Sequence, residues 1–401
     1  MKPALLVLAV MVSGVLQKTQ NTVFGGFTPT ASQQLAAEWR GHSRLRGNDV
    51  TPAQAGAGLA LPGHGALIAA GVQGQDALAT ESRTKPVSAP LPKESMNLQA
   101  IPFKIMYCTY CQTKGKENWE LYTINADGTG MTNLTNTPDV DEMYPHVSAD
   151  GTKICFVTDE GRGDNKVRHV YYMNIDGSQR VHVAAHARDP CWCFDGKSIA
   201  YLNDEYKRFS SREYATSGLS FYHLDKSWRS QHPNTKLEHL YAICWSPDSK
   251  WFVAAVEGGM GYSDAIIAFE AFGTKVFDLA TWGVKGCRPD LSLDGARMVW
   301  GETDWNLRTG EIDLKSPEPK VTNVRDLLRC AQKYKVYHVD ISPDSKYIAF
   351  SYGPWAGGQQ VGGMAEGWNL CVGDLNGNWV QITSDGNHNK EPDWVPIPLK
   401  N

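Results

Sequence analysis

The sequence predicts an all-β protein, a six-bladed β-propeller, and two features of the chain lead to this prediction. The first is a short phrase that occurs five times. Each copy begins with an apolar residue, which is usually followed by a serine. An Asp-Gly or Asp-Ser pair comes next and leads into a β-branched or aromatic run. These pairs tolerate the positive φ angles of a tight turn, so each copy predicts a strand, a turn and a second strand. The turn aspartates are Asp150, Asp195, Asp248, Asp294 and Asp344.

The second feature is the spacing of these turns. Successive turn aspartates lie 45, 53, 46 and 50 residues apart, by subtraction of their numbers. A repeat of this length accommodates four short strands and is typical of propeller blades.

The remaining strands can be placed around this repeat. Six segments have the pattern of an outer strand that ends in a polar turn: residues 121–128, 170–177, 221–224, 276–279, 311–314 and 370–377. A sixth inner strand is found at Glu391–Trp394, because it matches the inner strands at 189–192 and 288–291. We therefore expect this C-terminal strand to pair with the strand at 103–108. Such closure removes the free strand edges of an open array.

Composition divides the 401-residue chain near residue 100. Residues 1–20 have one early positive charge, Lys2, and a short apolar run, which predicts a secretory signal peptide and is too short for a membrane span. Residues 21–100 are rich in Ala, Gly, Thr, Pro and Gln, and this composition predicts a disordered linker. The propeller is expected over residues 101–398. The net charge of −4 gives no reason to expect a nucleic-acid partner.

The repeat phrase resembles that of a known family. Trp245-Ser246-Pro247-Asp248, Ile341-Ser342-Pro343-Asp344 and the Asn-x-Asp-Gly turns are similar to the repeat of the TolB-like six-bladed propellers. The resemblance covers about residues 102–397 and implies the fold. It does not choose a function, because the family includes periplasmic scaffolds, sensor domains and the propeller halves of peptidases. Residues 1–100 do not resemble the α/β domain that precedes the propeller in TolB.

Equivalent positions of the six inner strands should form rings around the central channel. The first ring, just before the apolar anchor of each strand, is His146, Cys191, Cys244, Asp290, Asp340 and Asp393. The second ring, two residues earlier and on the same side if side chains alternate, is Tyr144, Asp189, Ala242, Arg288, His338 and Glu391. The anchors, Val147, Trp192, Trp245, Leu291, Ile341 and Trp394, should pack between blades.

The first ring is a candidate metal site. Its three carboxylates, Asp290, Asp340 and Asp393, suit a hard cation such as Ca²⁺. His146, with Cys191 or Cys244, suits a transition metal instead. The competing hypothesis is a water-lined channel in which the ring side chains bond to neighbouring backbone and Arg288 offsets their charge.

Cysteines and catalytic motifs give weaker signals. The chain has nine cysteines, and Cys191 and Cys244 occupy equivalent places where a disulfide is conceivable. Cys108 and Cys111 have the spacing of a redox or metal pair, but no second pair completes a zinc site, so a structural role in the first blade is expected.

The sequence has no His-Glu-x-x-His, phosphate-loop or Gly-x-Ser-x-Gly motif, which argues against an enzyme without deciding the question.

Insertions follow the second strand of several blades, at 203–214, 257–262, 304–306 and 353–364. Because they share one position in the repeat, they should lie on one face of the propeller, called the loop face below. Loops that present aromatic and long side chains on a rigid scaffold commonly form recognition surfaces. The expected partner-binding residues are Tyr206, Arg208, Tyr214, Tyr262, Trp305, Trp355 and Met364.

Two functions follow from these observations. The favoured hypothesis is a non-catalytic binding or scaffold propeller of the bacterial cell envelope, periplasmic or secreted, that holds a protein or peptide partner on the loop face. The alternative is a metal-binding propeller enzyme, or the propeller subunit of a periplasmic enzyme complex, with its site in the central channel. That alternative would resemble the sugar-acid lyases or hydrazine synthase.

Overall fold

The computed structural model describes residues 96–315, 317–331, 333–355 and 367–397. They belong to one compact unit that spans residues 83–401. The predicted signal peptide, nearly all of the predicted linker and Met364 lie outside the described residues. In the part of the chain that is described, no helix has the length and apolar character needed to cross a membrane.

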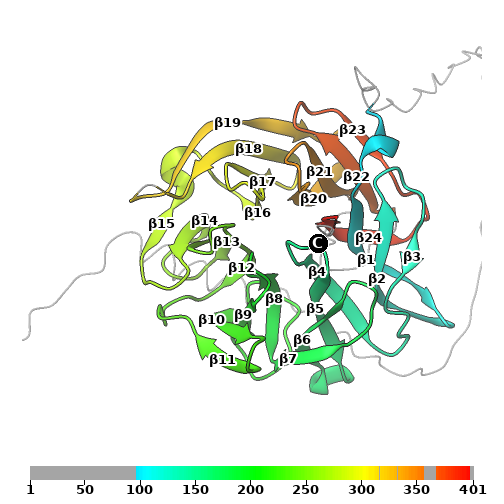
Figure 1. The fold of residues 1–401 in the computed structure, drawn as a ribbon, viewed down its shortest axis with the longest axis horizontal. Helices are drawn as coiled ribbons and strands as arrows, with labels where there is room; N and C mark the ends of the chain where they lie inside the picture. The colour runs from blue at the N-terminus through cyan, green and yellow to red at the C-terminus, as the bar shows by residue number, and fades with distance from the viewer. Residues whose placement is uncertain (1–95, 316, 332, 356–366, 398–401) are drawn as a thin grey trace, which may run out of the picture. The chain divides into compact units, whose positions relative to one another are not determined.

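Six four-stranded antiparallel sheets surround a central axis, which confirms the all-β six-bladed propeller (Figure 1). Blade 1 contains β24 (His388–Val395), β1 (Lys104–Thr113), β2 (Lys116–Asn125) and β3 (Thr132–Asn133). Blade 2 contains β4 (Asp141–Val147), β5 (Lys153–Glu160), β6 (Val167–Asn174) and β7 (Val181–Ala185). Blade 3 contains β8 (Ala187–Trp192), β9 (Ser198–Asp204), β10 (Thr216–His223) and β11 (Trp228–Gln231).

The second half of the ring repeats this order, with the first-named strand of each blade nearest the axis (Figure 1). Blade 4 contains β12 (Leu240–Trp245), β13 (Trp251–Glu257), β14 (Asp264–Glu270) and β15 (Val276–Asp278). Blade 5 contains β16 (Cys287–Leu291), β17 (Arg297–Thr303), β18 (Asn306–Asp313) and β19 (Lys320–Arg329). Blade 6 contains β20 (Tyr334–Ile341), β21 (Tyr347–Pro354), β22 (Asn369–Asp374) and β23 (Trp379–Gln381). Three 3₁₀ turns complete the described elements: η2 (Leu98–Ala100), η3 (Gly163–Asn165) and η4 (Leu279–Trp282).

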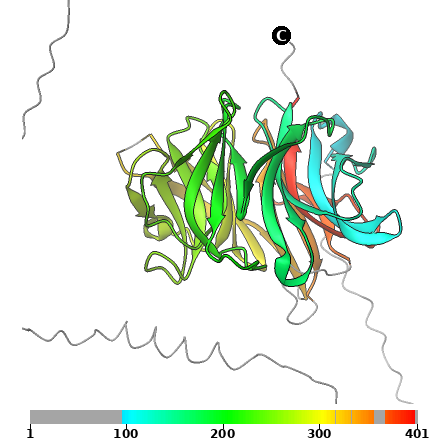
Figure 2. The same ribbon diagram turned by 90° about the horizontal axis from the view of Figure 1, so that it is seen from below.

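The last strand closes the ring as expected from the sequence. β24 pairs antiparallel with β1, and Trp394 lies opposite Ile105 while Asp393 lies opposite Met106. Figure 2 shows β24, in red, beside β1, in cyan. The innermost strand of blade 1 therefore comes from the far end of the sequence, and the other three come from its beginning.

Hydrogen bonds within the turn explain the recurrent Ser-x-Asp phrase. In blade 2, Asp150 Oδ1 accepts from Ser148 Oγ at 2.6 Å and from the Thr152 N–H at 3.0 Å, and Ser148 Oγ accepts from the Lys153 N–H at 3.0 Å. The same bonds recur at Ser246 and Asp248, at Ser292 and Asp294, and at Ser342 and Asp344. The residue after each aspartate has positive φ, as an Asp-Gly or Asp-Ser turn requires.

One expected outer-strand match is displaced. In most blades the outer-strand pattern marks the end of the third strand, as at β2, β6 and β22. In blade 4, however, the pattern at 276–279 begins in the short fourth strand, β15, and the third strand is β14. The match at 276–279 was therefore not the equivalent of the third strand. β14 ends at Glu270 and is followed by Ala271-Phe272-Gly273, without the Asn-x-Asp-Gly turn of blades 1 and 2.

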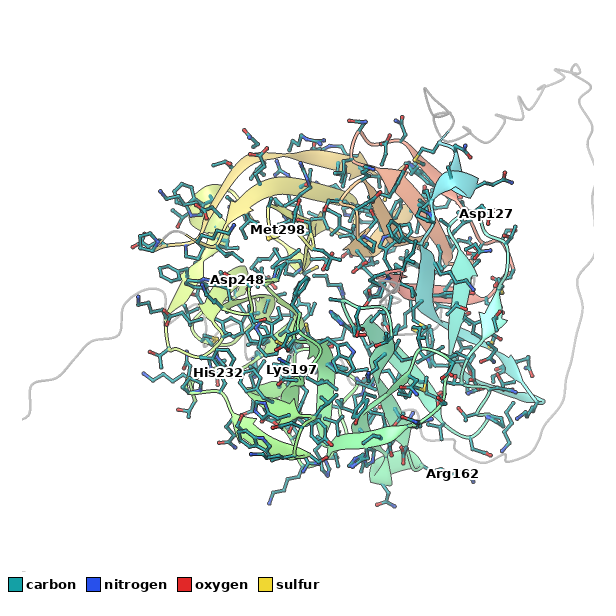
Figure 3. The ribbon with its side chains drawn as sticks, in the orientation of Figure 1. Asp127, Arg162, Lys197, His232, Asp248 and Met298 are labelled. Carbon is teal, nitrogen blue, oxygen red and sulfur yellow. The ribbon has the colours of Figure 1, made fainter. Side chains whose placement is uncertain are left out.

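The core is a series of apolar layers between neighbouring blades. All six inner-strand anchors are buried, from Trp394 at 2% exposure to Trp245 at 6%. Figure 3 shows side chains filling the space between the sheets, with Met298 inside this layer and Asp127 and Arg162 near the rim. Because each blade packs on two neighbours, the inner strands are held rigidly around the axis.

Candidate functional site in the central channel

A β-bulge in every inner strand places both rings on the channel. The six residues of the second ring have left-handed backbone, with φ from 46° at Asp189 to 55° at Glu391. The pairing register shifts at this point in all six blades. Simple alternation of side chains was therefore the wrong reason for grouping the two rings, although all of the second ring and all of the first except Cys191 line the channel. The residue between them, a proline in four strands, lines it as well.

The first ring joins each blade to the next through hydrogen bonds. The carboxylate of Asp290 accepts from the Ile341 N–H at 2.9 Å. In the same way Asp340 accepts from the Trp394 N–H at 3.1 Å, and Asp393 from the Val147 N–H at 2.8 Å. His146 Nδ1 lies 3.4 Å from the Trp192 nitrogen. The Cys191 thiol faces the backbone N–H of Trp245 in the same way, and the Cys244 thiol faces that of Leu291.

These contacts follow one rule: the ring side chain of one blade accepts from the anchor N–H of the next. The hypothesis of a water-lined channel predicted such bonds between ring side chains and neighbouring backbone. They also explain why acceptor side chains occupy this position in every blade, since an unpaired N–H on the inner edge would cost free energy.

Burial controls the protonation of the first ring. It raises the pKa of Asp290 to about 6, and it raises the pKa values of Asp340 and Asp393 well above the ordinary range. The other ring carboxylates add to the increase at Asp340. Burial lowers the pKa of His146 to about 4, so this imidazole is neutral at neutral pH. Burial thus disfavours the charged forms of the ring side chains, although Asp290 still ionises near pH 6.

The second ring lies toward the loop face, where a charged side chain from an inserted loop joins it. Glu213, in the connection between β9 and β10, forms an ion pair with Arg288 and accepts from the Tyr144 hydroxyl at 3.1 Å. The Arg288 guanidinium also lies 5.7 Å from the Tyr241 ring centre and 5.3 Å from that of Tyr337. Burial opposes the ionisation of Glu213, but Arg288, Lys390 and the Tyr144 hydroxyl outweigh it and lower the pKa of this carboxyl.

The partner of Arg288 was not expected from the sequence, which suggested that Arg288 offsets the charge of the first ring. Glu213 lies inside the insertion at 203–214, and no repeat position marks it. Only the folding of that loop over the channel brings the two charges together.

A second charged cluster lies beside the first. The buried Lys390 ammonium is 2.9 Å from Glu391 Oε1 and 4.3 Å from the Trp119 ring centre. Glu391 Oε2 accepts from the Tyr144 N–H at 2.8 Å and from the Cys108 thiol at 3.0 Å. The Cys108 thiol thus links strand β1 to strand β24 within blade 1.

The channel between the rings is a small cavity of about 140 Å³, lined by Tyr144, Asp189, Glu213, Arg288, His338 and Glu391 toward the loop face. The His338 side chain is 8% exposed, and neither of its ring nitrogens has a hydrogen-bond partner. Burial raises the pKa of Asp189 to about 7 and lowers that of His338 well below its usual range. The cavity is polar and suits small polar groups rather than an apolar ligand.

The metal hypothesis gains nothing from this geometry. Among the described residues, no group of three or more His, Cys, Asp or Glu side chains is arranged to hold a metal ion. Asp290, Asp340, Asp393 and His146 each face a backbone N–H of the next blade instead. Metal binding at these four residues stays a prediction.

The cysteines are all free thiols. The disulfide considered between Cys191 and Cys244 is not formed, and Cys108 is not bonded to Cys111. Cys191 Sγ lies 3.5 Å from His146 Nε2, but burial raises the pKa of this thiol and lowers that of the imidazole. Both groups are thus neutral at neutral pH, which does not favour a nucleophilic thiolate.

The expected partner-binding residues divide into two groups on the loop face. Tyr206 and Arg208 are exposed in the β9–β10 connection, whereas Tyr214 and Tyr262 are half-buried. The ring centres of Tyr214 and His239 are 6.1 Å apart, and Tyr262 packs against the core of blades 3 and 4. Trp305 and Trp355 are 40% and 48% exposed and contact each other edge to face at 5.7 Å.

Comparison with known proteins supports the architecture. No family model and no curated protein matches the chain in sequence. The structure of TolB from Acinetobacter baumannii is similar, with a TM-score of 0.54 and 17% identity, over 73% of this chain and 67% of that one. Hydrazine synthase from Kuenenia stuttgartiensis is similar with a TM-score of 0.50 and 13% identity, over 74% of this chain and 47% of that one. Identities this low establish the fold alone. The chain therefore has the fold of the TolB-like six-bladed β-propellers, as the resemblance in its repeat phrase implied.

Proposed function

We propose that this protein is a non-catalytic binding propeller that holds a protein or peptide partner on its loop face. The observation that carries the proposal is the contact between Trp305 and Trp355, two large side chains from different blades that are both substantially exposed. Aromatic side chains that are already ordered in the free protein lose little entropy on binding, and they are enriched at protein interfaces.

The tryptophan pair is continuous with the channel mouth. The Lys335 ammonium lies 5.5 Å from the Trp305 ring centre and 2.6 Å from Asp304 Oδ2. It also lies 3.4 Å from the Tyr337 hydroxyl, and the Tyr337 ring in turn faces Arg288 of the second ring. A partner on the tryptophans could thus extend a polar segment toward the cavity.

The arrangement favours binding over catalysis. Arg288, Glu213, Lys390 and Glu391 are held in ion pairs, so their charges serve the structure first. The neutral state of Cys191 and His146 leaves no activated nucleophile in the first ring.

A matched set of tryptophan variants tests the proposal. Full-length wild type, Trp305→Ala, Trp355→Ala and Trp228→Ala would be immobilised and incubated with an envelope extract of the source organism, and retained proteins identified by mass spectrometry. Trp228 is 47% exposed on the outer strand β11, away from the loop face, and serves as the control. We expect a species that wild type and Trp228→Ala retain and that both loop-face variants lose. Equal recovery by all four proteins would refute the proposal.

Location in the cell envelope belongs to the same proposal. It rests on the signal-like start of the sequence and on the similarity in fold to TolB. Fractionation of cells that express the full chain, with detection of an N-terminally shortened product in the envelope fraction, tests it. A full-length product confined to the cytoplasm would contradict it.

The enzymatic alternative is tested by metal content. Protein without a histidine tag, purified without chelators, would be analysed for bound metals by mass spectrometry. About one tightly held metal per chain, lost in Asp340→Asn, would favour a channel site and the alternative function.

A further inference from the structure

Two histidines face each other on the outer part of blade 2, away from the channel. His169 is on β6 and His182 is on the edge strand β7. The Nδ1 atom of His169 lies 3.1 Å from the Nε2 atom of His182, and the ring centres are 5.2 Å apart. His182 is exposed and His169 is half-buried, so solvent reaches the pair.

Neighbouring aromatic rings order the pair. The Tyr171 ring lies edge-on to His182 with 5.1 Å between centres, and Phe156 stacks on Tyr171 at 6.1 Å. A shift in register between β6 and β7 occurs at this point, where Tyr171 is opposite His182. The two imidazoles are therefore held by the sheet rather than by flexible loops, which limits the cost of ordering them around a ligand.

The charges around the pair are nearly offset. Glu160 is close enough to act electrostatically on both His182 and Tyr171. Arg180 stacks over Tyr171 at 4.6 Å, but its charge is paired with Glu142 at 2.9 Å. The metal would bind the two imidazoles in their neutral form, which is the form of histidine that coordinates metals.

The separation of the nitrogens fits a chelated transition metal. Metal–nitrogen bonds to histidine are about 2.0–2.1 Å long. Two such bonds to nitrogens 3.1 Å apart subtend about 98° at the metal, nearer the right angle of a tetragonal site than the tetrahedral angle. Tetragonal coordination by nitrogen and oxygen is typical of Cu²⁺ and Ni²⁺, and Cu²⁺ binds more tightly in the usual order of stability.

We propose that His169 and His182 form a surface binding site for a divalent transition metal, with Cu²⁺ preferred, whose remaining coordination positions are filled by water. In the structure the two ring nitrogens face each other at hydrogen-bonding distance. On metal binding, the hydrogen on the facing nitrogen moves to the other nitrogen of the same ring, which leaves both facing nitrogens free to coordinate. No third protein ligand is in place among the described residues. The site is independent of the proposed partner-binding function.

Copper titration of the untagged, metal-free full-length protein tests the site. Binding would be followed by calorimetry against a glycine competitor, and coordination by electron paramagnetic resonance at one equivalent of Cu²⁺. We expect a single strong site whose spectrum shows two nitrogen ligands. His169→Gln and His182→Gln should each lose about 100-fold in affinity, the order that a second, intramolecular contact contributes.

Two controls locate the site. His186→Gln removes an exposed histidine four residues beyond His182 and should leave the affinity unchanged. His146→Gln removes the histidine of the first ring and should also leave it unchanged. Wild-type affinity in both His169→Gln and His182→Gln, with circular dichroism showing that they are folded, would overturn the proposal. Loss of the strong site in His146→Gln alone would overturn it in favour of the channel.

Discussion

The Val147 N–H donates to the Asp393 carboxylate, with 2.8 Å between N and Oδ2, across 246 positions of sequence. This bond joins the last strand of the chain to blade 2, and it is one of six equivalent contacts around the first ring. Closure of the propeller therefore depends both on the pairing of β24 with β1 and on the ring side chains.

Trp394→Ala should weaken closure strongly. Trp394 is 2% exposed, its ring lies 6.3 Å from that of Phe103, and its indole N–H donates to the Asp340 carbonyl at 3.2 Å. Removal of a buried tryptophan side chain costs about 3–5 kcal/mol of unfolding free energy. Guanidinium denaturation measures it, with the exposed Trp228→Ala as the control that should change stability by less than about 0.5 kcal/mol. A similarly small effect at Trp394 would mean that the C-terminal strand adds little to the fold.

The pH dependence of stability should respond to Asp290. Its pKa in the folded protein is about 6, above the ordinary value of 3.8, because burial disfavours the carboxylate. The folded state thus holds this proton more tightly, and the stability it contributes below pH 4 is lost as the pH rises toward 6. The Asp290→Asn variant has no proton to lose in this range, so its stability does not fall for this reason as the pH rises. Its side-chain amide oxygen can still accept from the Ile341 N–H.

The stability of Asp290→Asn relative to wild type should therefore increase by about 2 kcal/mol between pH 4 and pH 7, allowing for the water that reaches the channel. Urea denaturation at a series of pH values measures the difference. The exposed Asp225→Asn variant, measured over the same pH range, is the control. A flat difference for Asp290→Asn would show that the ring carboxyl is not held protonated.

Arg288 and Glu213 should behave as a coupled pair. Both side chains are about 15% exposed or less, so removal of one leaves the other charge buried. Arg288→Met is expected to cost about 3–5 kcal/mol for this reason. Glu213→Gln should cost less, because Tyr241 and Tyr337 still face the guanidinium.

The double variant Glu213→Gln/Arg288→Met should recover part of the loss, with a coupling free energy of about 1–3 kcal/mol in a double-mutant cycle followed by urea denaturation. The Arg308 and Glu302 pair, which is more exposed, provides the comparison and should couple by less than about 1 kcal/mol. Additive effects at Arg288 and Glu213 would show that the contact across the channel mouth does not persist in solution.

The bulge geometry can be tested at Ala242, where the backbone is left-handed with φ of 48°. Glycine adopts this conformation without strain, so Ala242→Gly should raise the unfolding free energy by about 0.5–1 kcal/mol. Ala254→Gly, in the regular strand β13, should lower it by at least about 0.5 kcal/mol. Denaturation of the two variants gives opposite signs if the bulge is present, and the same sign if the inner strand of blade 4 is regular.

The sequence by itself determined the architecture. The Ser-x-Asp turns fix local strand pairing through bonds within five residues, and their spacing sets the four-strand length of each blade. Matching of Glu391–Trp394 to the other inner strands then predicted ring closure. These features are local or repeated, so they can be recognised without coordinates.

Only the tertiary structure decided how the channel is used. The bulge depends on pairing between strands, and the partner of Arg288 comes from a loop 75 residues away. Likewise, His169 and His182 face each other because a register shift aligns two strands, which their spacing in sequence does not reveal. Contacts of this kind arise from the packing of distant segments, so a repeat in one sequence predicts the positions of the residues but not their partners.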